Sequence, residues 1–164
     1  MPPSMTHGPI DITLHVLGRH GFDYSMIDDG VFIGTNMCCQ YGFDKELLSK
    51  GVRADISLEE DKVDAPKGVD YFLWLPTVNG RPPFPDKLEL GVQAISFFIG
   101  RNIPLFIHCK NGHGRAPVLF IAYLIRKGMG VDEAIAHVRK QRPTMHLTDE
   151  QLDGLKRFAE TRAI

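Results

Sequence analysis

The chain has 164 residues, 43% of them hydrophobic, and its formal net charge at neutral pH is −1. This length and composition are typical of a single globular domain with a core of ordinary size. A nearly neutral chain has no overall attraction for nucleic acid, so we expect no nucleic-acid partner, and any affinity for phosphate must be local.

The two ends of the sequence carry no recognisable targeting signal. The first ten residues, MPPSMTHGPI, lack a basic start followed by an apolar run, and no stretch approaches the ~18 apolar residues of a membrane span. The last four residues contain no prenylation cysteine, so we expect no membrane anchor. Cys38, Cys39 and Cys109 form neither a metal-binding spacing nor an even set for disulfides, which indicates a reducing compartment. We therefore predict a soluble cytoplasmic protein, with residues 1–21 as a partly mobile extension and 22–164 as the folded domain.

Strand-like and helix-like segments alternate along the chain, which predicts a single α/β domain with a mainly parallel central sheet flanked by helices. In such a sheet, ligands bind at the carboxyl ends of the strands. Asp132 and Thr148 are the expected N-terminal caps of the last two helices, and Gln151 stands at capping-box spacing from Thr148. In chain order we expect a helix over 88–98, a strand over 103–107, and helices over 116–126, 131–140 and 148–161.

The most informative segment joins the predicted strand to the helix that follows it, and reads HCKNGHGRA. It places Cys109 and Arg115 at the two ends of a glycine-rich turn. A loop that enters a helix points several backbone N–H groups at one spot, and these donors stabilise a phosphate or a thiolate there. Gly112 and Gly114 tolerate positive or crowded backbone angles. Arg115 offers a planar fork to two phosphoryl oxygens, so we predict a phosphate-binding loop with a nucleophilic thiolate.

A simpler interpretation makes Cys109 a buried residue at a strand end, His108 a satisfied core side chain and Arg115 a surface ion-pair partner. Free cysteines are buried more often than they are reactive. This interpretation leaves unexplained why a cysteine, two glycines and an arginine coincide within one short strand-to-helix junction, so we favour the catalytic one.

The motif resembles the signature of the cysteine-dependent protein tyrosine and dual-specificity phosphatases, H-C-x5-R followed usually by Ser or Thr. The resemblance extends over about residues 22–162 and implies the dual-specificity phosphatase fold, of the atypical type. The strings Gly-Arg-Ala-Pro-Val-Leu and Gly-x-Pro-Pro are similar to those of the phosphatases of regenerating liver. Upstream, the resemblance implies a hairpin of 24–27 with 31–34, a helix near 44–50, a strand over 52–58, and a strand over 70–76 that leads into the general-acid loop.

The resemblance also implies a covalent mechanism that needs no metal or other cofactor. Cys109 attacks phosphorus, Arg115 and the loop amides hold the equatorial oxygens, and water hydrolyses the phosphocysteine. His108 is expected to organise the cysteine through hydrogen bonds. Phosphate, sulfate and vanadate are the expected site ligands. The predicted substrate-binding residues are His108, Lys110, Asn111, Gly112, His113, Gly114 and Arg115.

Three positions bear on the proton transfers and on the breakdown of the intermediate. Asn79 stands where the family's acid loop presents an aspartate, and an amide cannot supply the ~10² to 10⁴-fold of a general acid. Asp86 is an alternative acid, although a helix-start carboxylate is the competing interpretation; the run at 59–61 is another source of carboxylate, expected as an exposed charged loop. Ala116 replaces the hydroxyl residue that helps hydrolysis, which implies slow breakdown. Gln151 is predicted either to orient the hydrolytic water or to serve only in the capping box.

We therefore predict a protein tyrosine or dual-specificity phosphatase of low turnover that acts on a phosphorylated protein. Without an acid, a phenol with a pKa near ~10 leaves more easily than an alkoxide. Lys110 and His113 stand where phosphoinositide 3-phosphatases carry two lysines, so a phosphoinositide or inositol phosphate is an alternative substrate. Plant glucan phosphatases share Gly-Arg-Ala-Pro, with Trp74 as a candidate sugar-stacking residue, although a strand tryptophan is expected in the core. A phosphate-binding pseudophosphatase scaffold is the remaining alternative.

Overall fold

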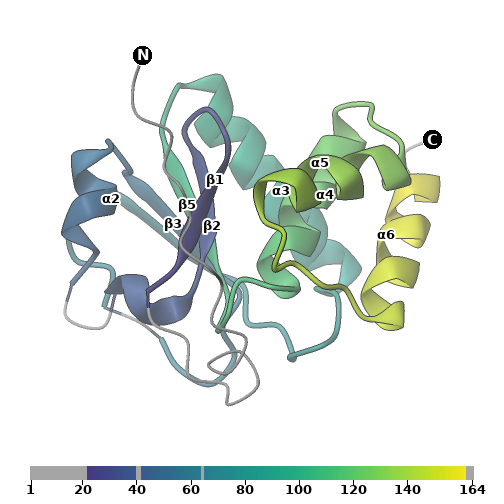
Figure 1. The fold of residues 1–164 in the computed structure, drawn as a ribbon, viewed down its shortest axis with the longest axis horizontal. Helices are drawn as coiled ribbons and strands as arrows, with labels where there is room; N and C mark the ends of the chain where they lie inside the picture. Colours follow the sequence, from purple (N-terminus) through teal and green to yellow (C-terminus); the bar gives the residue numbers. More distant parts are fainter. Residues whose placement is uncertain (1–21, 40–41, 64, 162–164) are drawn as a thin grey trace.

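The computed structural model describes residues 22–39, 42–63 and 65–161, which form a central sheet with helices on both of its faces (Figure 1). The predicted alternation of strands and helices is confirmed. In chain order the elements are β1 (Tyr24–Asp28), β2 (Val31–Gly34), η1 (Asn36–Cys39), α2 (Lys45–Ser49), β3 (Ala54–Ser57), β4 (Tyr71–Trp74), α3 (Pro85–Gly100), β5 (Leu105–His108), α4 (Arg115–Arg126), α5 (Val131–Gln141) and α6 (Asp149–Thr161).

The five strands lie in the order β1-β2-β5-β3-β4. β1 and β2 form the predicted antiparallel hairpin, and Gly30 at φ +73 makes its tight turn. The pairs β2 with β5, β5 with β3 and β3 with β4 are parallel, which confirms the mainly parallel sheet. The carboxyl ends of parallel strands lie at the same edge of a sheet. His108 therefore lies beside Gly34 on one side and Ser57 on the other, at the edge where a ligand is expected.

The two faces of the sheet support two separate cores, because successive side chains of a strand point to opposite faces. Ile56 and Ile107 belong to the larger core, which α3, α4, α5 and α6 cover. Phe32 and Phe106 belong to the smaller core on the side of η1 and α2. Figure 1 shows this division, with α2 on one side of the sheet and the other four helices on the opposite side. Every residue of α4 from 115 to 125 is buried, so this helix is the centre of the larger core.

The helix boundaries correct two details of the sequence prediction. α3 begins at Pro85, three residues before the predicted start at Leu88, because proline fits the first turn of a helix, where its missing N–H has no partner to lose. Asp132 is not an N-terminal cap: Gly130 holds that position, and Asp132 lies in the first turn of α5, where a carboxylate complements the helix dipole.

The Thr148–Gln151 capping box is confirmed. The Gln151 backbone N–H donates to Thr148 Oγ1 at 3.2 Å, and the Thr148 backbone N–H donates to Gln151 Oε1 at 3.0 Å. The predicted extension at residues 1–21 lies outside the described residues, as do residues 162–164. None of the described helices combines the length and the apolar character needed to cross a bilayer.

Candidate active site

The sheet edge and the start of α4 bring Cys109 and Arg115 to one cavity. β5 ends at His108 and α4 begins at Arg115, so the intervening loop, 109–114, spans the predicted junction. Cys109 and Arg115 are only 3% and 2% exposed. The cavity has a volume of about 200 Å³. It is lined by Asn79, Gly80, Cys109, Lys110, Asn111, His113, Gly114, Arg115, His146, Thr148 and Gln151.

The backbone carbonyls of the loop are turned away from the cavity by hydrogen bonds to the surrounding protein. Arg142 Nε donates to the carbonyl of Gly112 at 2.6 Å, and its Nη2 donates to that of Asn111 at 3.1 Å. The backbone N–H of Asn36 donates to the Lys110 carbonyl at 3.2 Å. Since the C=O and the following N–H of a peptide point in opposite directions, these contacts direct the loop N–H groups toward the cavity, where they can hold an oxyanion.

Arg142 is a residue that the sequence reasoning missed. It caps the C-terminal end of α5 and is 1% exposed, which is rare for a charged side chain. Its guanidinium is compensated by Asp23 Oδ2 at 2.9 Å and Ser25 Oγ at 3.1 Å, besides the loop carbonyls. No local pattern marks this position in the sequence, because its partners lie 30 or more residues away along the chain.

A Cβ would be crowded at both loop glycines, but for different reasons. Gly112 has φ +66, and a Cβ there would lie 2.6 Å from the Gly34 carbonyl oxygen. Gly114 has an ordinary negative φ of −131, but a Cβ there would lie 2.9 Å from Gln151 Nε2. The predicted positive backbone angle is thus confirmed for Gly112 but not for Gly114, where the crowding comes from the side chain of Gln151, which lies directly against the loop.

Arg115 is held by groups that follow β3 and β4. Its Nη1 donates to the Thr77 carbonyl at 2.8 Å, and its Nη2 lies 3.8 Å from Glu59 Oε1. Its Nε is buried and has no hydrogen-bond partner among the described residues. A buried guanidinium N–H without a partner is costly, so an anion in the cavity would relieve it.

Glu59 corrects the expectation that residues 59–61 form an exposed charged loop. It is 1% exposed, because it directly follows β3 at the sheet edge and its carboxylate faces the guanidinium of Arg115. Asn36 Nδ2 donates to its Oε2 at 2.8 Å, and Trp74 Nε1 donates to its backbone carbonyl at 2.7 Å. Trp74 is itself 40% exposed, so the expectation of a core tryptophan is wrong; it ends β4, the edge strand of the sheet.

His108 points to the opposite side of the sheet from the cavity and is fully buried. Its Nε2 lies 3.2 Å from Asp55 Oδ1. Burial alone would disfavour the charged ring, but the adjacent Asp55 carboxylate outweighs it and raises the pKa of His108 well above its ordinary value. His108 and Gly112, both predicted to bind substrate, are not among the cavity-lining residues.

The predicted acid position faces the cavity, and the alternative acid does not line it. Asn79 lines the cavity with Cys109, and its backbone N–H donates to Glu60 Oε1 at 3.0 Å. Asp86 is exposed in the first turn of α3 and accepts a hydrogen bond from the backbone N–H of Lys87 at 2.9 Å. Among the residues that line the cavity, the acid position is therefore an amide, and none of the lining residues is a carboxylic acid.

Two further polar groups complete the rim. His146, which the sequence reasoning did not identify, stacks at a tilt against His113 with ring centroids 5.1 Å apart. His113 is 7% exposed, so of the two predicted basic positions only Lys110 stands open at the rim. The amide oxygen of Gln151 caps α6, which confirms its predicted capping role, and the residue also lines the cavity, where the alternative role of orienting water would be exercised.

The comparisons with known proteins agree with this architecture. The family model "Dual specificity phosphatase, catalytic domain" matches residues 48–161. The human "Phosphatidylglycerophosphatase and protein-tyrosine phosphatase 1" is 34% identical over 77 residues, which are 46% of this chain and 38% of that protein. The mouse "Protein tyrosine phosphatase type IVA 3" is 31% identical over 93 residues, 56% of this chain and 53% of that protein.

A solved phosphatase structure matches this chain over a longer stretch than these relatives do. The crystal structure of PTPMT1 in complex with PI(5)P has a TM-score of 0.72 and 27% identity, and covers 85% of this chain and 96% of that chain. By contrast, the chain spans only about half or less of the length of the curated relatives that it matches.

Proposed function

The chain belongs to the dual specificity phosphatase catalytic-domain family, and we propose that it hydrolyses phosphate monoesters through a phosphocysteine intermediate at Cys109. The proposal rests on one observation: Cys109 and Arg115 both line the same small cavity. Outward-facing loop carbonyls leave the loop N–H groups free to bind the phosphoryl oxygens.

The reaction follows from this arrangement in two displacements. The Cys109 thiolate attacks phosphorus, and the bond to the leaving oxygen breaks with its electron pair. Arg115 and the loop N–H groups hold the three non-bridging oxygens, which carry the negative charge in the transition state. Water then attacks the phosphocysteine, which releases inorganic phosphate and restores the thiolate. Gln151, at the cavity wall, is the candidate to orient that water.

We propose phosphotyrosine in a protein as the preferred substrate. Asn79, at the cavity wall, has no proton to give to the leaving oxygen. A phenolate with a conjugate-acid pKa near ~10 leaves without that help far more readily than an alkoxide. With Ala116 in place of a hydroxyl residue, the second displacement is also expected to be slow.

A phosphorylated lipid headgroup is the second candidate, and the relatives favour it. One relative is named as a phosphatidylglycerophosphatase, and one similar structure contains PI(5)P. On this chain, the exposed Lys110 and the exposed His146, whose ring lies against the buried His113, would supply the contacts to further phosphates. Both candidates use the same chemistry at Cys109 and differ in what lies outside the cavity.

The test of the chemistry is Cys109→Ser, because serine retains the shape of the side chain and loses the thiolate nucleophile. We expect hydrolysis of an aryl phosphate to disappear, whereas vanadate binding, measured by calorimetry, should persist through Arg115 and the loop. Turnover above about a tenth of the wild-type rate would contradict the assignment of the nucleophile. Vanadate binding without any wild-type turnover would instead identify a phosphate-binding scaffold.

The test of the substrate compares kcat/KM for a phosphotyrosine peptide with kcat/KM for PI(5)P in phosphatidylcholine vesicles. We expect the peptide to be preferred, and Lys110→Ala to change its kcat/KM little. If the vesicle substrate is preferred and Lys110→Ala lowers its hydrolysis selectively, the lipid candidate is correct.

A further inference from the structure

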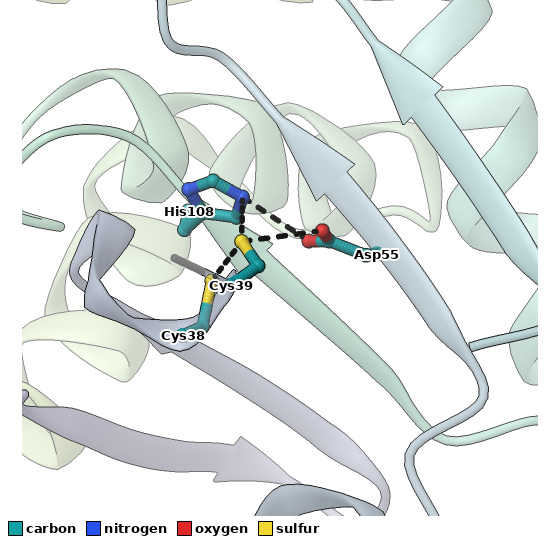
Figure 2. Close-up of side chains that lie close together, drawn as sticks. All are labelled: Cys38, Cys39, Asp55 and His108. Carbon is teal, nitrogen blue, oxygen red and sulfur yellow. Dashed lines mark hydrogen bonds and ion pairs between the residues drawn. The ribbon is translucent and has the colours of Figure 1, made fainter. Parts of the chain in front are cut away.

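Four potential metal ligands meet behind the active site, on the opposite face of the sheet. Cys38 and Cys39 come from η1, Asp55 from β3 and His108 from β5, and their ligand atoms all lie within 4.8 Å of one another. None of the four side chains is more than 1% exposed. Figure 2 shows the Cys39 sulfur at the centre of the group, in contact with the other three.

The sheet explains how residues that are distant in sequence gather here. Asp55 and Phe106 are register partners in the parallel pair of β3 and β5, and so are Ser57 and His108. Since side chains alternate along a strand, Asp55, Phe106 and His108 share one face, which is the face that η1 covers with its two cysteines. No spacing in the sequence reveals this cluster, so the absence of a metal-binding cysteine spacing does not exclude a metal.

The distances within the cluster agree with a tetrahedral zinc site. Metal–sulfur bonds of ~2.3 Å and metal–nitrogen or metal–oxygen bonds of ~2.0 to 2.2 Å separate the ligands of zinc by roughly 3.3 to 3.8 Å. Cys39 Sγ lies 3.8 Å from His108 Nε2 and 3.9 Å from Asp55 Oδ2, and His108 Nε2 lies 3.2 Å from Asp55 Oδ1. The two Asp55 distances are to different oxygens of its carboxylate, so a small rotation of that carboxylate is needed before one oxygen, the imidazole nitrogen and the Cys39 sulfur form one face of a tetrahedron.

Cys38 would supply the fourth ligand of the tetrahedron. Its sulfur lies 2.7 Å from that of Cys39, closer than the ~3.7 Å between two sulfurs on one zinc ion. A side-chain rotation that moves the Cys38 sulfur by about 1 Å would lengthen the distance between the two sulfurs to this value.

We propose that Cys38, Cys39, Asp55 and His108 form a structural zinc site. Sulfur and imidazole ligands select a soft or borderline ion over magnesium or calcium, which prefer oxygen. Four protein ligands with no exposed position are characteristic of structural zinc. Binding displaces the protons of the imidazole Nε2 and of the two thiols. The charges of two thiolates and one carboxylate then exceed those of Zn²⁺ by one, less than the excess of two in a four-cysteine site.

The position of the cluster gives the metal a role in the proposed active site. His108 precedes Cys109 directly, and η1 begins with Asn36, which binds both the Lys110 carbonyl and the Glu59 carboxylate. A zinc ion that ties β3, β5 and η1 together therefore fixes three supports of the catalytic loop. Zinc should raise the Tm of the protein by favouring the folded state.

The experiment uses Cys109→Ser, in which Cys38 and Cys39 are the only thiols that remain. The protein is freed of metal with a chelator and titrated with Zn²⁺ and, separately, with Co²⁺. We expect one equivalent to bind, a thiolate-to-cobalt charge-transfer band in the near ultraviolet, and a Tm that rises with zinc concentration. Asp55→Asn should weaken binding by more than the ~10- to 100-fold that loss of an outer-shell partner costs. Asp70→Asn is the matched control, because Asp70 is half exposed and pairs with Arg53 away from the cluster.

X-ray absorption at the zinc edge of the Cys109→Ser protein gives a result even if the ligand variants do not fold. A shell with sulfur at the thiolate–zinc distance of ~2.3 Å as well as nitrogen or oxygen supports the site, because only Cys38 and Cys39 can supply a thiolate in this variant. A shell of nitrogen and oxygen alone, or no stoichiometric binding to Cys109→Ser, overturns the proposal. Since Cys109→Ser has no catalytic thiol, neither outcome depends on the proposed phosphatase activity.

Discussion

Asn79 is the residue that most directly affects the chemical step. It lines the cavity beside Cys109, yet its side chain has no titratable proton, and its backbone is held by Glu60. The exposed Asp86 does not line the cavity. The proposed preference for phenol leaving groups therefore rests on this one amide.

Asn79→Asp should therefore introduce a general acid. We expect kcat for alkyl phosphates to rise toward the ~10² to 10⁴-fold that such groups supply, with a smaller rise for activated aryl phosphates, which need less help to leave. The gain should fall as pH rises, because only the protonated carboxyl can donate. The measurement is kcat for both substrate types across a pH series.

Asp86→Asn is the comparison for this prediction. It removes the carboxyl at the start of α3 that the sequence offers as the alternative acid, and it should leave turnover unchanged. If Asp86→Asn abolishes the activity while Asn79→Asp has no effect, Asp86 is the acid and Asn79 has been aligned with the wrong position.

At the scale of elements, the catalytic loop depends on the end of α5. Arg142 holds the carbonyls of Asn111 and Gly112 outward and is itself fixed by Asp23 and Ser25 of the first strand region. The orientation of the loop N–H groups is thus set by an interaction between elements, not by the loop sequence alone. This makes Arg142 a positioning residue for the proposed chemistry.

Arg142→Lys should keep the positive charge and lose the fork that binds two carbonyls at once. We expect kcat/KM to fall by about 10² because the loop N–H groups are misplaced, together with weaker vanadate binding. The control is Asp23→Asn, which leaves the loop contacts of Arg142 in place and should have a smaller effect. A loss of Tm in Arg142→Lys with unchanged kcat/KM and vanadate affinity would show that Arg142 only stabilises the fold.

At the scale of the whole molecule, stability depends on the larger core and on α4 within it. Leu119 is fully buried in α4 and packs closely against Gly91 of α3, where a Cβ would lie 2.5 Å from a Leu119 methyl group. Leu90, one residue away in α3, is 50% exposed. The α3–α4 pair therefore contains one buried leucine, Leu119, and one largely exposed leucine, Leu90, whose truncations can be compared.

Leu119→Ala should lower the free energy of unfolding by about 2 to 5 kcal/mol, because it leaves a cavity between α3 and α4. Leu90→Ala should change it by about 0.5 kcal/mol or less, since its side chain is largely in water. Urea denaturation measures both. Equal effects of the two variants would contradict the described packing of α3 on α4.

Features encoded by neighbouring residues can be predicted from the amino-acid sequence alone. The Cys109–Arg115 motif, the Thr148–Gln151 capping box and the alternation of strands and helices are local, because a turn, a cap or a periodic face involves residues a few positions apart. These patterns were sufficient to predict the fold class and the position of the candidate site. They did not predict that Glu59 is buried, since a charged run is usually exposed unless a distant cation compensates it.

The distant groups that support the site become visible only in the folded protein. Arg142 reaches a loop 30 residues before it, and His146 stacks on His113, because helix packing and not sequence spacing brings them together. The cluster of Cys38, Cys39, Asp55 and His108 exists because β3 and β5 are in parallel register and η1 covers the same face. Strand register fixes which side chains share a face, and it is set by the packing of the whole sheet, so no local pattern could have revealed it.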